Sequence, residues 1–176
     1  MMNQAEQMWK AIIRKGLQKD ADFKDKLFLQ PGASEEELNH LQETMNVTIP
    51  KEMKELYRIH NGQLWDIGSQ CFVGNLTLSP ISEILENWHF LNEEFEGDEL
   101  EASFDKEIKP LLWNPKWLPI ASNGGGDYLC LDMDPTDEGQ TGQVLYFWHD
   151  WGNRSVKAKS LFEFIQGCLE ESDTED

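Results

Sequence analysis

The sequence has few basic residues for its length of 176. It contains 15 lysines and arginines against 33 aspartates and glutamates, which gives a formal net charge of −18 at pH 7. A chain with this charge repels the phosphate groups of nucleic acids and of anionic membranes, so direct binding to either is disfavoured. It attracts basic proteins, because long-range attraction raises the rate of association. The same acidity also keeps a protein in solution. The net charge therefore indicates either a basic partner or only solubility.

Long hydrophobic runs and closely spaced cysteines are also missing. No stretch approaches the roughly 18 apolar residues of a membrane-spanning helix, and residues 1–4 lead into no apolar run with a cleavage site. Cys71, Cys130 and Cys168 lie too far apart for the Cys-x-x-Cys spacing of a metal site. We therefore expect a soluble, cytoplasmic protein with reduced thiols, no cofactor and no membrane contact.

Large apolar side chains, by contrast, are abundant. Seven tryptophans and nine phenylalanines supply the hydrophobic surface for the core of one domain. After a first amphipathic helix near the N-terminus, Ser34 and Glu37 form the Ser-x-x-Glu pattern of a capping box and predict a second helix. Pro50 suits the first turn of a third helix, which Asn61 and Gly62 are expected to end in a left-handed conformation.

The middle of the chain combines a turn, a helix and an excess of acid. The Gly-Asn pair at 74–75 predicts a tight hairpin, and the Ser-Pro pair at 79–80 begins a helix. Residues 83–107 contain ten carboxylates and one lysine. We expect this helix to be followed by a solvated, mobile acidic loop around Gly97.

Strand signals dominate the last third. Short apolar runs predict strands at 117–121, 127–132 and 143–148, and a glycine turn at 124–126 joins the first two. Aromatic residues on both faces of the 143–148 run indicate a strand that helices cover. Ser160 and Glu163 predict a second capping box before a C-terminal helix. No linker is long enough to divide the chain into two domains.

Three sequence blocks, in order along the chain, match a known pattern. Their main residues are Pro50, Asn61 and Gly62; Trp117, Pro119, Gly125, Gly126, Asp127 and Asp132; and Gly142, Gln143, His149, Asp150 and Ser160. Together they resemble the SMI1/KNR4 family, also called SUKH, over residues 34–169. This leaves 1–33 as an N-terminal helix and connector and 170–176 as an acidic tail.

The resemblance implies both a fold and a kind of function. The fold is α+β, with a mixed, largely antiparallel sheet packed by several helices in a single domain. The function that it implies is interaction: many bacterial relatives look like immunity proteins, which bind and neutralise toxins, often nucleases, and fungal relatives are linked to cell-wall synthesis and signalling. The family has no established catalytic residues, so the resemblance transfers none.

Three aspartates are the strongest sign of an enzyme. Asp132 and Asp134 resemble the start of a calcium loop, but Pro135 follows them and no glutamate closes the loop. A metal-assisted hydrolase that uses Asp127, Asp132 and Asp134 is therefore only a third hypothesis. The alternative is that Asp127 caps the glycine turn and that the other two end a strand.

Two further pairs allow catalytic interpretations. Asp132 and Asp150 lie at consecutive predicted strand ends, where neighbouring carboxylates would suit a hydrolase. His149 beside Asp150 suggests proton transfer, but no serine or cysteine stands in the context of a nucleophile. The glycines at 124–126 precede a strand and lack the lysine of a phosphate loop. The sequence thus favours no catalytic residue.

A protein-binding surface is the interpretation that the residues favour. Trp151 lies in a polar turn, and tryptophans often anchor interfaces. Exposed carboxylates would pair with the lysines and arginines of a partner. The candidate binding residues are Trp151, Asp150, Asp134, Glu93, Glu94, Glu96, Asp98 and Glu99.

Two functions fit such a surface. We expect an immunity-type protein that binds and neutralises a basic toxin domain, possible targets including nucleases. The alternative is a regulatory scaffold in cell-wall synthesis or stress signalling. Both predict a protein partner, and they differ in whether that partner is a toxin.

Overall fold

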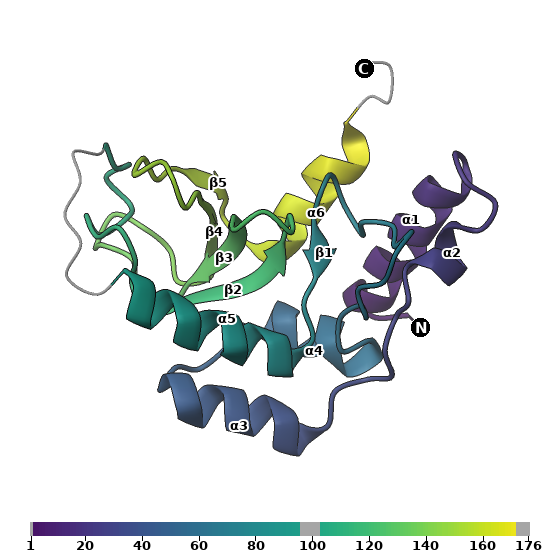
Figure 1. Cartoon of the computed structure of the whole chain (residues 1–176), viewed down its shortest axis with the longest axis horizontal. Coiled ribbons are helices and arrows are strands. Elements are labelled where there is room, and N and C mark those ends of the chain that lie inside the picture. The colour runs from purple at the N-terminus through teal and green to yellow at the C-terminus, as the bar shows by residue number, and fades with distance from the viewer. Residues whose placement is uncertain (1, 96–102, 172–176) are drawn as a thin grey trace.

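The computed structural model of the chain describes residues 2–95 and 103–171 (Figure 1). Within them, helices and one sheet form a single α+β domain, as predicted. None of the helices in these two ranges combines the length and the apolar composition that a membrane span requires. The helices are α1 (Gln4–Leu17), α2 (Phe23–Lys26), α3 (Glu35–Met45), α4 (Lys51–Ile59), α5 (Ile81–Glu94) and α6 (Leu161–Glu170). The strands are β1 (Thr77–Leu78), β2 (Trp117–Ser122), β3 (Tyr128–Asp132), β4 (Gln143–Phe147) and β5 (Val156–Ala158).

The sheet is a meander with the strand order β1-β2-β3-β4-β5. Each named strand pairs with its neighbour in antiparallel orientation. Short connections between β2, β3, β4 and β5 favour this arrangement, since a parallel pair needs a longer crossover. The mixed character that we expected is limited, in the described ranges, to an isolated parallel bridge between Phe104 and Arg154.

Both faces of the sheet are covered. Leu129, Leu131 and Val144 join the larger core, which contains residues of α1, α3, α4 and α6. The side chains that alternate with them, such as Cys130 and Leu145, join a smaller aromatic core. Figure 1 shows α5 along one side of the sheet, where it contacts β2, while α6 contacts β4 and β5. The aromatic strand that we predicted therefore lies between two apolar layers.

The predicted helix starts are confirmed. The capping box at Ser34 and Glu37 is complete in both directions. Pro50 is the N-cap of α4, one position before the helical turn that we predicted for it. At α6, Ser160 accepts a hydrogen bond from the backbone N–H of Glu163. The Glu163 carboxylate instead accepts from the backbone N–H of Lys159, so this capping box is only half formed.

The end of α4 confirms the prediction in part. His60 has an extended backbone there, and the left-handed residue is Gly62, with φ +70°. A Cβ on Gly62 would lie 2.5 Å from the backbone nitrogen of Pro80, so glycine permits a close approach of two segments. Asn61 accepts a hydrogen bond from the backbone N–H of Ile81. The Asn-Gly pair therefore positions the start of α5, in addition to following α4.

The hairpin at 74–75 is present as a tight turn, closed by a bridge between Val73 and Leu76. In β2, the register shifts between Pro119 and Ala121, which suits a proline because it donates no ladder hydrogen bond. The acidic loop expected around Gly97 lies outside the described residues.

Candidate protein-binding surface

The end of β4 lies beside the glycine turn that precedes β3. Antiparallel pairing sets Tyr128, the first residue of β3, opposite Phe147, the last residue of β4. Residues just before Tyr128 and just after Phe147 therefore meet at one edge of the sheet. Trp148 and Trp151 form an isolated antiparallel bridge, which folds the chain back at this edge.

Asp127 connects these two segments. Its Oδ1 accepts hydrogen bonds from the backbone N–H of His149 at 3.0 Å and from His149 Nδ1 at 2.9 Å. Its Oδ2 accepts from Asn123 Nδ2 at 3.0 Å. Partial burial raises the pKa of Asp127, but the bonds from His149 and Asn123 outweigh it and leave that pKa below its ordinary value. The hydrogen bond to Asp127 raises the pKa of His149.

The cap of the glycine turn is a different residue from the one we predicted. Asn123 Oδ1 accepts from the backbone N–H groups of Gly125 and Asp127, at 2.8 and 3.2 Å. Gly126 has φ +97°, and a Cβ there would lie 3.1 Å from His149 Nδ1. Glycine at 126 thus leaves the space in which His149 reaches Asp127.

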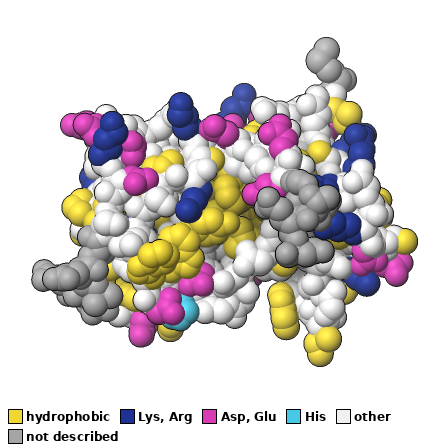
Figure 2. All heavy atoms as spheres, turned by 90° about the horizontal axis from the view of Figure 1, so that it is seen from above, with side chains coloured by type: hydrophobic (Ala, Val, Ile, Leu, Met, Phe, Trp, Pro, Cys, Tyr) yellow, Lys and Arg dark blue, Asp and Glu magenta, His cyan; other side chains and the backbone are white. Residues whose placement is uncertain are grey.

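Tyr146, Trp148 and Trp151 form what we call the aromatic surface. The rings of Tyr146 and Trp148 stack with their centroids 5.6 Å apart, and those of Trp148 and Trp151 are 5.3 Å apart. Lys157 Nζ lies 5.7 Å from the Tyr146 centroid and 5.3 Å from that of Trp148. Trp151 is 56% exposed. Figure 2, which looks down on the molecule from above, shows a hydrophobic patch bordered by both acidic and basic side chains.

Buried Arg154 supports the turn that carries Trp151. Its guanidinium donates to the carbonyl oxygens of Leu112 at 2.9 Å, Trp151 at 2.5 Å and Asn153 at 3.0 Å. It also lies 4.5 Å from the centroid of the Phe147 ring. Burial lowers the pKa of Arg154 to about 10, so the group stays charged at neutral pH. Nothing in the sequence singles out Arg154, because a single arginine in a polar loop carries no pattern.

A small pocket adjoins the aromatic surface. Its volume is about 130 Å³. It lies between the hairpin tip, the glycine turn and β4, and its lining residues are Asn75, Leu76, Asn123, Asp127, Tyr146 and Trp148.

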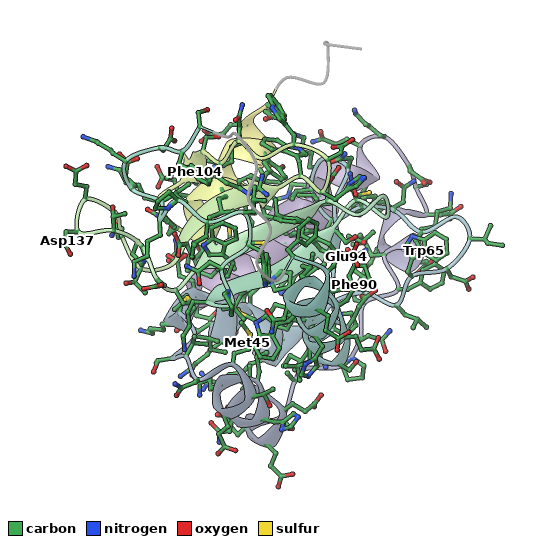
Figure 3. The ribbon with its side chains drawn as sticks, turned by 60° about the vertical axis from the view of Figure 1, so that its left-hand side comes forward. Met45, Trp65, Phe90, Glu94, Phe104 and Asp137 are labelled. Carbon is green, nitrogen blue, oxygen red and sulfur yellow. The ribbon has the colours of Figure 1, made fainter. Side chains whose placement is uncertain are left out.

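The remaining candidate binding residues lie elsewhere. Asp134, at the other end of β3, accepts from Lys109 Nζ at 2.6 Å and from Asn114 Nδ2 at 3.2 Å. Glu93 and Glu94 are exposed on α5, from which Glu94 extends in Figure 3. The structure therefore does not bring these residues together with Trp151 and Asp150. Glu96, Asp98 and Glu99 lie outside the described residues.

The predicted carboxylate pair of a hydrolase does not form. Asp132 pairs with Gln143 at the start of β4, whereas Asp150 follows the end of that strand. Asp127 and Asp132 likewise stand at opposite ends of β3, so the three aspartates of the metal hypothesis do not converge. Asp132 is fully buried and accepts from Gln143 Nε2 and from the backbone N–H of Asp134, both at 2.9 Å. Burial raises the pKa of Asp132.

The sequence suggested a pair between His149 and the neighbouring Asp150, but the hydrogen-bond partner of His149 is Asp127. Asp127, His149 and Asp150 offer ligand atoms within 4.8 Å of one another. His149 and Asp150 are exposed, and His149 is hydrogen-bonded to Asp127, with which it forms an ion pair when its ring is protonated.

Comparisons with known proteins agree on one family. A profile described as "SMI1 / KNR4 family (SUKH-1)" matches residues 32–167. A "Glucan synthesis regulatory protein" of Neurospora crassa is 23% identical and covers 81% of this chain and 34% of its own length. A "Cell wall biosynthesis/cell cycle regulator smi1" of Schizosaccharomyces pombe is 26% identical, covering 76% of this chain and 30% of its own length.

A third relative, the "Cell wall assembly regulator SMI1" of Saccharomyces cerevisiae, is 19% identical over 78% of this chain and 34% of its own length. The chain thus spans about a third of the length of these relatives. The profile match extends from just before α3 into α6 and includes every strand of the sheet. The chain belongs to the SMI1/KNR4 family.

Proposed function

We propose that this chain is a non-catalytic protein-binding module with a regulatory role, and that the aromatic surface is where its partner docks. The observation that carries the proposal is the exposure of Trp151 on a turn that buried Arg154 holds in place. A large ring held in position loses little conformational entropy on binding, and such rings often supply most of the affinity of an interface.

The names of the relatives favour regulation over toxin neutralisation. They refer to glucan synthesis and to cell-wall assembly, and they match the alternative hypothesis of a scaffold in cell-wall synthesis or stress signalling. We therefore prefer this alternative to the immunity-type function. The net charge of −18 suits a basic partner under either hypothesis.

The test is capture of partners by the tagged full chain and by two matched variants. Trp151→Ser removes the anchor of the aromatic surface. Trp65→Ser removes a tryptophan that is 66% exposed and lies on a loop at the edge of the molecule (Figure 3). Purified recurrent partners are then measured by calorimetry at 50 and 300 mM salt.

We expect Trp151→Ser to weaken binding about tenfold or more, and Trp65→Ser to leave it within twofold. Loss of binding in Trp65→Ser alone would mean that the docking surface is wrong. Regulators or wall-synthesis proteins among the partners would support the scaffold, and a secreted toxin domain would return the immunity-type function to first place. Failure to bind any protein with measurable affinity would contradict the proposal.

A further inference from the structure

We infer that the small pocket beside the aromatic surface receives an arginine side chain of the partner. This inference rests on the proposed function, because it names the chemistry by which the same surface would recognise a protein. Four elements supply the pocket: the hairpin tip, the glycine turn, the residue before β3 and the end of β4.

The size of the pocket suits one side chain. Its volume of about 130 Å³ is well below the roughly 300–1,000 Å³ of pockets that hold cofactors and other small molecules. Its apolar lining residues are Tyr146, Trp148 and Leu76. Its polar lining residues are Asn75, Asn123 and Asp127. An aromatic, acidic and amide lining favours a cation that is partly apolar.

The hydrogen bonds of Asp127 leave its carboxylate able to accept a further bond from a guanidinium. Among the described residues, Asp127 Oδ1 accepts two bonds from His149, whereas Oδ2 accepts one bond, from Asn123. A carboxylate oxygen accommodates more than one donor. A carboxylate oxygen of Asp150 lies within 4.8 Å of a carboxylate oxygen of Asp127 and of a ring nitrogen of His149. Negative charge therefore adjoins the aromatic lining.

The rings themselves already attract a cation. Lys157 Nζ lies within 6 Å of both centroids, which is the range of a cation–π contact. Lys157 is not part of the pocket lining. Tyr146 and Trp148 therefore contact Lys157 and also line the pocket. A guanidinium suits the pocket better than an ammonium because it is planar, stacks on aromatic rings and donates in a fixed fork to a carboxylate.

The experiment uses nuclear magnetic resonance of the ¹⁵N-labelled full chain. The probes are the capped tripeptide acetyl-Gly-Arg-Gly-amide, its lysine counterpart and its citrulline counterpart, which keeps the shape of arginine without the charge. We expect the arginine peptide to shift the indole N–H signal of Trp148 and the backbone amides of Asn75 and Asn123. The lysine peptide binds several-fold more weakly, and the citrulline peptide produces no saturable shift.

Variants separate a built site from general attraction to an acidic protein. Asp127→Asn weakens arginine binding about fivefold, as expected for a partly exposed ion pair. Asp137→Asn removes the same charge from the loop between β3 and β4, where Asp137 extends at the edge of the molecule (Figure 3). It changes binding by less than twofold, because it lies at the opposite end of these strands from the pocket.

Substituting Lys157 gives a test in which tighter binding is expected, so a loss of stability could not produce the expected result. Lys157→Gln removes the resident cation near the rings, so arginine binding becomes about twofold tighter. The matched variant Lys159→Gln removes a charge from an exposed residue two positions further along and leaves binding unchanged.

Three results would overturn the inference: equal shifts with the arginine and citrulline peptides, equal weakening by Asp127→Asn and Asp137→Asn, or no saturable shift at 50 mM peptide. If the whole partner still binds through Trp151 in that case, the proposed function stands and only the arginine pocket is wrong. If the partner also fails to bind, both proposals fall.

Discussion

Replacing Arg154 with methionine tests how the aromatic surface is held. The guanidinium donates to three carbonyl oxygens, those of Leu112, Trp151 and Asn153, and lies over the ring of Phe147. Methionine has a similar length and fills the apolar part of the space, but it donates no hydrogen bond. The variant therefore isolates the loss of these bonds from the loss of packing.

The size of the effect follows from opposing contributions. Each hydrogen bond from a charged donor is worth roughly 1.5–3 kcal/mol, and a desolvated cation–π contact adds about 2 kcal/mol. Against this stands the cost of burying the cation, which is of the order of several kcal/mol. The net loss expected is about 3 kcal/mol, a large part of the roughly 5–15 kcal/mol that stabilises a typical domain.

Urea unfolding followed by tryptophan fluorescence measures this loss. With a slope of about 2 kcal/mol per molar urea, Arg154→Met lowers the midpoint by about 1.5 M. The control is Arg58→Met, because Arg58 forms an exposed ion pair with Glu35 at 2.7 Å and its removal costs about 0.5 kcal/mol or less. Equal midpoints for Arg154→Met and the unmodified chain would refute the reasoning, since the buried carbonyl group of Leu112 would then have lost its donor at no cost.

Three other substitutions test separate features of the structure. Gly62→Ala destabilises the fold by about 2 kcal/mol or more in thermal unfolding, because φ is +70° and the added methyl group meets the backbone of residues 78–80. The control is Gly167→Ala, in open space on α6, which stabilises the fold by about 0.5 kcal/mol. Burial raises the pKa of Asp132, so the ionised carboxylate opposes folding above that pKa and stability rises as the pH falls through it; Asp132→Asn removes this rise, as urea midpoints between pH 7 and 4 will show. The pKa of His149 is raised by its aspartate partner, so its contribution is complete below the unfolded pKa and disappears as the pH rises through the folded pKa; a His149→Gln variant whose stability followed the same pH curve would contradict this.

Much of the fold could be predicted because its signals are local. The capping box at Ser34, the proline before α4 and the glycine turn before β3 each act within a few residues. Two elements were not predicted because they are too short to carry such a signal. Helix α2 has only four residues, and β5 has three residues with Lys157 at its centre, so neither carries a periodic pattern.

The site was harder to predict, because it depends on which strand ends meet. The sequence orders Asp132 and Asp150 along the chain, but only the antiparallel register shows that they lie at opposite ends of β4. In the same way, Asp134 is a plausible binding residue until Lys109, which is 25 positions away in sequence, is seen to pair with it. The contribution of Arg154 is of this kind too, since Leu112 is 42 positions away.

Rigid support is the property that joins the two proposals. The ring of Tyr146 packs against that of Phe164 in α6, with the two centroids 6.1 Å apart. The aromatic surface therefore continues into the larger core. Arg154 holds the turn that carries Trp151, and Asp127 connects the glycine turn to His149, just after β4. A partner that inserts an arginine between fixed rings and a fixed carboxylate needs little reorganisation of this chain. Variants that loosen the support should therefore weaken binding even where they leave every contacting side chain in place.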